Sequence, residues 1–451
     1  MRYKAKIIFT LLILVNTSLA AQSQDSLKNL WSEAKISGQV RHFWMGTINQ
    51  GELKEYSAAA LGGKIGLSSG SYRGFSAAAF MYSSFNLGIS DLSEPDPTTG
   101  RLARYDLGLF DIHEPDKRFL YLLGEAYLQY KNPQHTFRAG RMLYKTPMLN
   151  PQDGRVIPTL GQGLWYQNSS MEKWKLSAGY IHSFAVRSTS GWHTVENSLG
   201  LYPEGRNPSG SAGNYRGNTE SSGILMQGVA YNDQQFFRAK VWNYTVTNVF
   251  NAVYADFELK KNLGDDQTLK LEGQYIWEVP LNNGGNPDPT LAYFNPDFRT
   301  HVLGGRSSYR HGDYIFSLAF NRILAGGQYL FPREWGRDAL FTFQKRERQD
   351  GQANAWAILA KLHYNGIEKL RMESGYGFYQ HRDPQDAFYN KYAMPSYHQI
   401  NLDVFYDLSQ RLEAEFLLAY KIGASPSYEN PNFVINKVNM ANINLILNYN
   451  F

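Results

Sequence analysis

The sequence predicts an all-β protein, a transmembrane antiparallel β-barrel of about 18 strands. Three observations predict it. Segments that alternate apolar and polar residues recur from residue 35 to the end, and their connections are alternately short and long. The last alternating segment ends on an aromatic residue, Phe451. A period of two places apolar side chains on one face of a strand, and short turns opposite long loops are typical of bacterial outer-membrane barrels.

The start of the chain has the features of a secretory signal peptide. Three basic residues within the first six precede an apolar stretch, residues 7–15, and Ser18-Leu19-Ala20 provides a cleavage site with small residues. The apolar stretch is too short for a spanning helix, which needs roughly 20 residues. We therefore expect residues 1–20 to be removed and residues 21–451 to form a single barrel domain.

The composition excludes several classes of protein. Beyond the signal there is no run of 18 apolar residues, and the mean hydropathy is −0.44, which excludes a helical membrane protein. Aromatic residues make up 15% of the chain, as expected for two interfacial girdles. Cysteine is absent, which excludes disulfides and thiolate chemistry. The net charge of +5 includes the three bases of the signal, so the mature charge of about +2 gives no reason to expect nucleic acid as a partner.

Eighteen segments are predicted as strands, and an even number returns both chain ends to the periplasmic side. They lie near 36–45, 57–68, 73–82, 119–130, 135–143, 162–168, 173–185, 224–232, 235–247, 250–260, 267–277, 298–309, 313–322, 352–364, 369–380, 398–407, 411–421 and 439–451. The patterns at 162–168 and 224–232 are the weakest, which leaves sixteen strands as an alternative. The long connections span 84–117, 144–161, 186–222, 278–297, 323–351, 381–397 and 422–434.

The parity of the side chains assigns a face to each residue. Within 411–421, for example, Phe416 and Leu418 share one face and Glu415 lies on the other. An Arg or Lys at the lipid midplane costs roughly 2–4 kcal/mol, so the charged parity is expected to face the lumen. Basic residues are in modest excess there, which favours anions or carboxylate-bearing solutes. The predicted pore-lining residues are Arg41, Lys64, Glu125, Arg138, Arg238, Lys240, Glu272, Arg306, Arg310, Lys361, Arg371, Glu413, Glu415 and Lys421.

The last strand is expected to close the barrel. It must pair with both 411–421 and 36–45, because an unpaired edge in lipid would leave backbone groups without hydrogen bonds. Its apolar parity then faces lipid. Its asparagines, Asn442, Asn444, Asn448 and Asn450, lie on the luminal parity, and we expect them to line water.

The connection at 144–161 is predicted to be a stiff, non-helical loop. It contains three prolines, an Asn-Pro pair and an Asp-Gly pair, all of which favour fixed turns. Such a loop can fold into a lumen, where Asp153 and Arg155 would present opposite charges at a constriction. The alternative is an ordinary external loop in which Asp153 only stabilises a turn.

This segment resembles the third loop of the substrate-specific porins of the OprD family. The family pattern Pro-x-x-Asn-Pro-x-Asp-Gly-Arg-x-x-Pro is matched in register by Pro147, Asn150, Pro151, Asp153, Gly154, Arg155 and Pro158. The resemblance implies a monomeric barrel of about 18 strands, whose third loop narrows the channel. It also implies a series of basic residues that guides carboxylate-containing solutes such as amino acids. Glu413 and Glu415 depart from a purely basic path.

These observations favour a porin for passive, selective diffusion in the outer membrane of a Gram-negative bacterium. The expected solutes are anionic or carboxylate-bearing nutrients such as amino acids, and the other partners are outer-membrane lipid and lipopolysaccharide. A monomer is expected, with a trimer as the alternative, because a lipid-facing patch that oligomerises has no distinct sequence pattern. No cofactor is expected. Asp91, Glu94 and Asp96 lack the spacing of a known calcium loop, so no metal is predicted either.

Two other classes of function fit the sequence less well. A barrel enzyme needs Ser, His and a carboxylate to converge, yet His182 and Ser183 are adjacent and point to opposite faces of their strand. The sequence also has no H-E-x-x-H or G-x-S-x-G motif, so we expect no enzymatic activity. A structural or adhesive barrel could bind a partner through the loop at 186–222.

Overall fold

The computed structural model describes residues 26–152, 154–424 and 430–451. The expected signal peptide and Asp153 lie outside these ranges. Within them, no helix combines the length and apolar character needed to cross a membrane.

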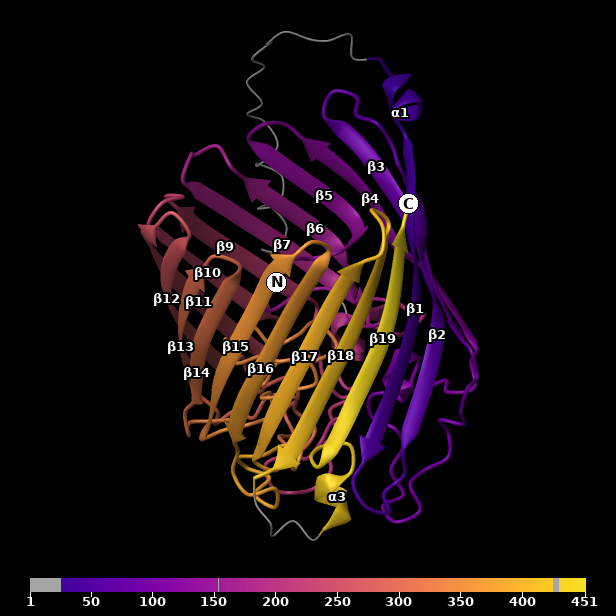
Figure 1. Ribbon diagram of the computed structural model, residues 1–451, viewed down its shortest axis with the longest axis vertical. Coiled ribbons are helices and arrows are strands. Elements are labelled where there is room, and N and C mark those ends of the chain that lie inside the picture. The colour runs from indigo at the N-terminus through magenta and orange to yellow at the C-terminus, as the bar shows by residue number, and fades with distance from the viewer. Residues whose placement is uncertain (1–25, 153, 425–429) are drawn as a thin grey trace, which may run out of the picture.

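The described chain forms a single antiparallel sheet that closes on itself (Figure 1). Of its nineteen strands, β8 (His193–Thr194) is a two-residue addition to β7, and the other eighteen form the wall. The wall strands are β1 (Lys35–Asn49), β2 (Tyr56–Ser68), β3 (Phe75–Asn86), β4 (Phe119–Lys131), β5 (His135–Met142), β6 (Leu160–Asn168), β7 (Trp174–Ala185), β9 (Ile224–Asn232), β10 (Phe237–Val246), β11 (Phe250–Gly264), β12 (Gln267–Pro280), β13 (Thr300–His311), β14 (Tyr314–Ile323), β15 (Ala355–Ile367), β16 (Leu370–Gln380), β17 (Tyr397–Asp407), β18 (Leu412–Gly423) and β19 (Met440–Asn450). The helices are short: α1 (Asn29–Ser32), α2 (Val195–Ser198), α3 (Pro431–Val434) and the 3-10 helix η1 (Leu107–Leu109).

The predicted barrel and its closure are confirmed. β19 pairs with β18 and with β1, where Thr47 lies opposite Asn442. Both doubtful strands exist, because β6 pairs with β5 and β7 while β9 pairs with β7 and β10. The alternative of sixteen strands is therefore wrong. In β19 the apolar parity is exposed, with Leu445 at 49%, as expected for side chains that face lipid.

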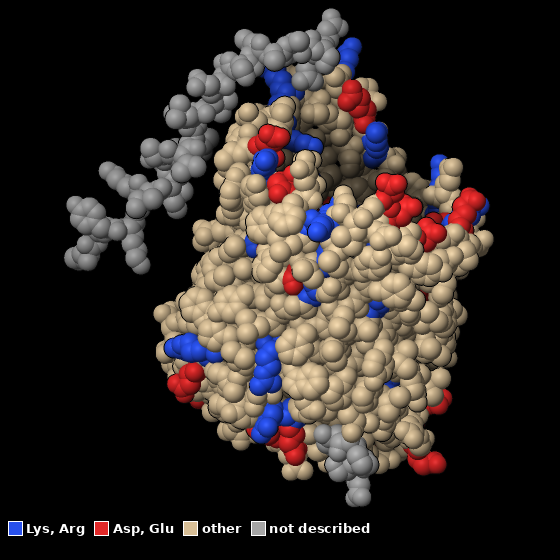
Figure 2. All heavy atoms as spheres, turned by 60° about the vertical axis from the view of Figure 1, so that its left-hand side comes forward, with Lys and Arg blue, Asp and Glu red and all other residues tan. Residues whose placement is uncertain are grey.

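The two ends of the barrel differ in their connections. The C-terminus and α1 lie at the end with short turns, uppermost in Figure 1, and α3 lies at the end with long loops. Asx turns fix the short connections: Asp233 Oδ1, for example, accepts from the backbone N–H groups of Gln235, Phe236 and Phe237. Figure 2 shows charged side chains gathered around a hollow at the turn end and sparse over the wall below it.

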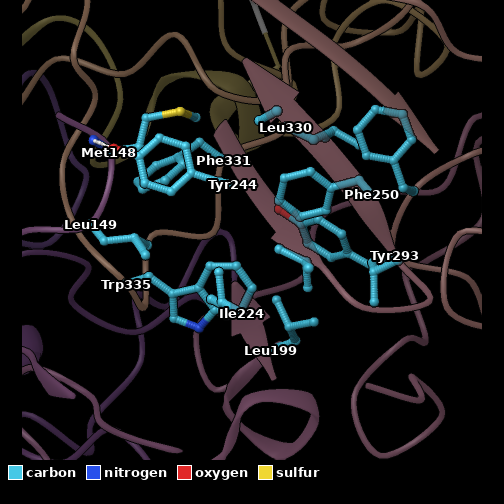
Figure 3. Close-up of a cluster of buried hydrophobic side chains, with 14 of the residues drawn as sticks. Met148, Leu149, Leu199, Ile224, Tyr244, Phe250, Tyr293, Leu330, Phe331 and Trp335 are labelled. Atoms are coloured by element: carbon cyan, nitrogen blue, oxygen red, sulfur yellow. Dashed lines mark hydrogen bonds between the residues drawn. The ribbon is translucent and has the colours of Figure 1, made fainter. Parts of the chain in front are cut away.

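The long loops fold into the barrel and form its core. We number the connections at the loop end: L2 is 87–118, L3 is 143–159, L4 is 186–223, L6 is 281–299, L7 is 324–354 and L8 is 381–396. Figure 3 shows one buried apolar cluster in which L3, L4, L6 and L7 meet the strands β9, β10 and β11. Trp335 of L7 belongs to this cluster, and its indole stacks on Phe184 and donates to Ser198 Oγ at 2.8 Å. Burial of these side chains inside the wall stabilises the folded loops.

The expectation that the β19 asparagines line water is wrong for Asn448, which is buried beside Arg41, and for the two at the loop end. Asn442 and Asn444 are 0% exposed. The guanidinium of Arg346 in L7 donates to both side-chain oxygens, at 2.8 Å for Asn442. Because L7 folds back over the wall here, these amides anchor a loop. The alternating pattern places these asparagines on the inner face of the wall, but it cannot show that a loop covers them.

Candidate functional site

L3 contacts parts of the wall that lie far apart around the barrel. At one point the backbone N–H of Met148 donates to the Tyr244 hydroxyl of β10, at 3.4 Å. At another, Arg41 of β1 donates to the carbonyl of Arg155, at 2.6 Å. Val156 and Ile157 pack on residues of β1 to β4, whereas Met148 and Leu149 pack in the cluster of Figure 3. L3 therefore spans the interior between β1 and β10.

Arg155 joins L3 to L2. Its side chain is buried, and the guanidinium donates to the carbonyls of Gly108 at 2.9 Å, Gly154 at 2.5 Å and Tyr105 at 3.2 Å. Burial lowers the pKa of Arg155 well below its usual value, and the charges of Arg346 and Arg187 lower it further. The guanidinium of Arg155 thus interacts with backbone carbonyl dipoles of L2 and L3. It does not face a cavity.

The other described residues of the L3 motif join L3 to L7 or line open space. Asn150 Nδ2 donates to the carbonyl of Arg337 at 3.2 Å, and its Oδ1 accepts from the N–H of the same residue at 3.2 Å. Pro151 accepts from the N–H of Thr159 at 3.0 Å, which fixes the turn around Gly154. Pro147, Asn150 and Pro151 line a cavity, and Pro158 is half-buried.

Two adjoining cavities remain open inside the barrel. The central cavity, of about 880 Å³, lies between L3, L7 and the wall from β9 to β17. The vestibule, of about 560 Å³, extends toward the turn end and includes Lys260, Thr268 and Arg310. Both are lined by Arg238, Glu258, Glu272, Arg306, Phe341 and Lys361, so the two volumes form one path.

The two cavities differ in their balance of charge. The central cavity is lined by six Lys or Arg and six Asp or Glu side chains. The vestibule is lined by six Lys or Arg side chains but only two Asp or Glu. The basic residues of the vestibule are Arg238, Lys260, Lys270, Arg306, Arg310 and Lys361. The electrostatic potential therefore becomes more positive toward the turn end.

In most of the ion pairs between wall strands, the basic side chain is more exposed than its acidic partner. The side chain of Arg238 is 53% exposed, whereas that of its partner Glu258 is 7% exposed. Lys240 pairs with Asp256 at 3.0 Å, and Arg306 pairs with Glu272 through two hydrogen bonds of 2.6 Å. The same order of exposure holds for Lys64 with Glu125 and Arg371 with Glu413, and it is reversed for Lys361 with Glu373. The guanidinium and ammonium groups thus form most of the charged surface.

Several predicted pore-lining residues are covered. Lys421 is fully buried, and its Nζ donates to the carbonyl of Arg346 at 2.5 Å and the hydroxyl of Tyr105 at 3.3 Å. Arg41 is buried between L3 and Asn448, whose Oδ1 it approaches at 2.7 Å. Arg138 donates to Gln129 Oε1 at 2.6 Å. These side chains lie on the inner side of the wall, but Arg41 and Lys421 are separated from the open path by loops.

L7 contributes residues that sequence reasoning missed. Arg337, Phe341, Phe343 and Lys345 line the central cavity. Lys345 Nζ lies 2.9 Å from Asp403 Oδ1 and 2.7 Å from Glu415 Oε1. Burial would lower the pKa of Lys345, but the Glu415 and Asp403 carboxylates outweigh it and raise the pKa above its usual value. The mixture of aromatic and charged residues at 341–348 is the signal that could have pointed to this loop.

The described residues contain no group of three or more His, Asp or Glu side chains that could hold a metal ion. Asp96, one of the acids considered for calcium, accepts hydrogen bonds from the backbone of Lys54, Thr98 and Thr99. Its carboxylate therefore organises the L2 backbone.

Comparison with known proteins agrees with this geometry. The family model of the outer membrane porins of the OprD family matches residues 113–354. No curated protein sequence matches the chain.

Three solved porin structures illustrate the likeness in fold. Pseudomonas aeruginosa OccK9 (OpdG) is 16% identical, with 94% of this chain and 99% of that chain covered and a TM-score of 0.73. P. aeruginosa OpdK, solved with vanillate, is 14% identical over 93% and 99% of the two chains, with a TM-score of 0.70. Acinetobacter baumannii OccAB2 is 13% identical over 94% and 99%, with a TM-score of 0.69. The chain belongs to the OprD family of porins, β-barrel channels of the Gram-negative outer membrane.

Proposed function

We propose that this porin allows passive diffusion of small anionic or carboxylate-bearing solutes, such as amino acids. The observation that carries the proposal is the charge of the vestibule, where six basic side chains face two acidic ones. Where base and acid are paired across β10 and β11, the base is the more exposed partner. A permeating carboxylate would meet guanidinium and ammonium groups before it met acids. The vanillate of the OpdK structure is itself a carboxylate, which supports the same solute class.

L3 and L7 are proposed to form the constriction. Pro147, Asn150 and Pro151 of L3 line the central cavity, as do Phe341 and Lys345 of L7. A solute would lose part of its hydration there, and weak contacts at several sites would offset that loss. Such binding must remain weak, because one tight site would stop the flux. We also propose that a monomer is the functional unit, because the sheet of a single chain closes into a complete barrel around the open path.

Channel recording in planar bilayers tests this proposal. Under a gradient of potassium chloride, the purified protein is expected to give discrete openings and a reversal potential that favours chloride. The preference should weaken in high salt, because the Debye length falls from about 10 Å at 0.1 M to about 3 Å at 1 M. A lack of discrete openings would reject the channel, and a preference for potassium would reject the anionic solute class.

A further inference from the structure

A run of carboxylates crosses three neighbouring strands beside the central cavity. Glu373 of β16 lies directly opposite Asp403 of β17 in the strand register. Glu415 of β18 lies opposite Phe405, one side-chain position along the same face from Asp403. Like charges placed directly opposite each other destabilise a sheet. This part of the wall therefore needs cations nearby.

Elsewhere the strands supply those cations themselves. Glu258, Asp256, Glu272 and Glu413 each pair with a base from a neighbouring or nearby strand, and Lys361 of β15 pairs with Glu373 at 2.7 Å. For Asp403 and Glu415, the base is Lys345, and it comes from L7. Among the ion pairs of the described residues, these two are the only ones that join a strand carboxylate to a loop base.

Residues 344–346 are hydrogen-bonded to the wall strands around these carboxylates. The carbonyl of Lys345 accepts from Gln399 Nε2 at 2.8 Å and from Asn401 Nδ2 at 3.0 Å. On one side of it, Gln344 Nε2 donates to the Tyr379 hydroxyl at 3.0 Å. On the other side, Arg346 donates to the β19 asparagines described above. Residues 344–346 thus hold the ammonium group against the two carboxylates.

We propose that Lys345 determines the charge selectivity of the constriction by offsetting part of the negative charge of Asp403 and Glu415. Lys345 and Asp403 both line the central cavity, so loss of the ammonium group would expose carboxylates to the solute path. The nearby bases could not replace it, because Lys361 and Arg371 already pair with Glu373 and Glu413. The constriction would then attract cations, and divalent cations most, since calcium prefers carboxylate oxygens. This inference rests on the proposed channel function. It assigns to Lys345 the role of keeping the constriction from repelling anions.

The test compares K345M with K260M in planar bilayers. Lys260 lines the vestibule and has no ion-pair partner among the residues that the structure describes, so its loss removes one charge without exposing a pair of acids. K345M is expected to raise the ratio of potassium to chloride permeability by roughly fivefold, clearly more than K260M does. Calcium chloride should reduce the current through K345M and leave that through K260M unchanged. K345R, which keeps the charge, should behave like the wild type.

Two further variants keep the proposal falsifiable if K345M fails to fold. The triple variant K345M/D403N/E415Q removes the exposed acids, so it should return selectivity to the wild-type ratio or shift it slightly further toward chloride. D403N/E415Q alone should shift selectivity toward chloride, because it leaves Lys345 unbalanced. The proposal is overturned if K345M shifts no further than K260M, or if D403N/E415Q leaves selectivity unchanged. If the wild type favours potassium but K345M still shifts toward cations, the proposed solute class fails and the role of Lys345 stands.

Discussion

R155A is expected to raise the single-channel conductance severalfold by releasing L3 from L2. Three backbone carbonyls, those of Tyr105, Gly108 and Gly154, would lose their donor inside the loop layer. Leaving a buried polar group unpaired costs about 1–3 kcal/mol. The free energy that holds L3 against L2 would therefore fall by several times RT. L3 would then sample positions farther from L7. Single-channel recording in symmetric potassium chloride measures the change.

K145A is the matched control for R155A, because Lys145 lies in the same loop and is exposed. It should leave the conductance unchanged. R155K should fall between the wild type and R155A, since an ammonium group can reach fewer of the three carbonyls than the planar guanidinium. An R155A channel with wild-type conductance would show that Arg155 does not hold L3 in place, or that L3 does not limit the current.

Neutralising the vestibule is expected to abolish the preference for anions. The triple variant K260M/K270M/R310M leaves three basic side chains beside the two acids of the vestibule. One unit charge at 4 Å contributes about 1 kcal/mol even in water, and 1.4 kcal/mol is a factor of ten. The ratio of chloride to potassium permeability should therefore fall by roughly tenfold at low salt, and less at 1 M salt. Reversal potentials at several ionic strengths measure this.

A second triple variant controls for the loss of net charge. Lys28, Lys173 and Lys261 are exposed near the turn end and line neither cavity. K28M/K173M/K261M should keep the wild-type reversal potential. If both triple variants shift selectivity equally, the vestibule is not the source of the anion preference.

The sequence determined the strands because their signal is local. A period of two is visible within each segment, and even the weak patterns of β6 and β9 correspond to paired strands. The stiffness of the L3 motif also follows from its own residues, because prolines and Asx turns fix the backbone of a loop locally. The partners of Arg155 could not be predicted, since its carbonyl acceptors at positions 105 and 108 come from L2 and depend on how two loops pack.

The surface of the path was only partly predictable for the same reason. Parity placed Lys421 and Asn444 on the inner face, but Arg346 of L7 covers both. Lys345 was missed because no periodic pattern marks a loop residue that folds back onto β17 and β18. Local periodicity thus gives the face of a strand residue, whereas tertiary packing of the loops decides whether solute can reach it.

Uptake of matched solutes tests the central claim most directly. Proteoliposomes that contain the wild-type protein would be exposed to butyrate or to butylamine, which differ in charge but little in size, and the rate of entry would be followed by light scattering. The positive vestibule predicts that butyrate enters faster than butylamine, and that the difference shrinks in high salt. Equal rates, or faster entry of butylamine, would contradict a channel selective for carboxylates.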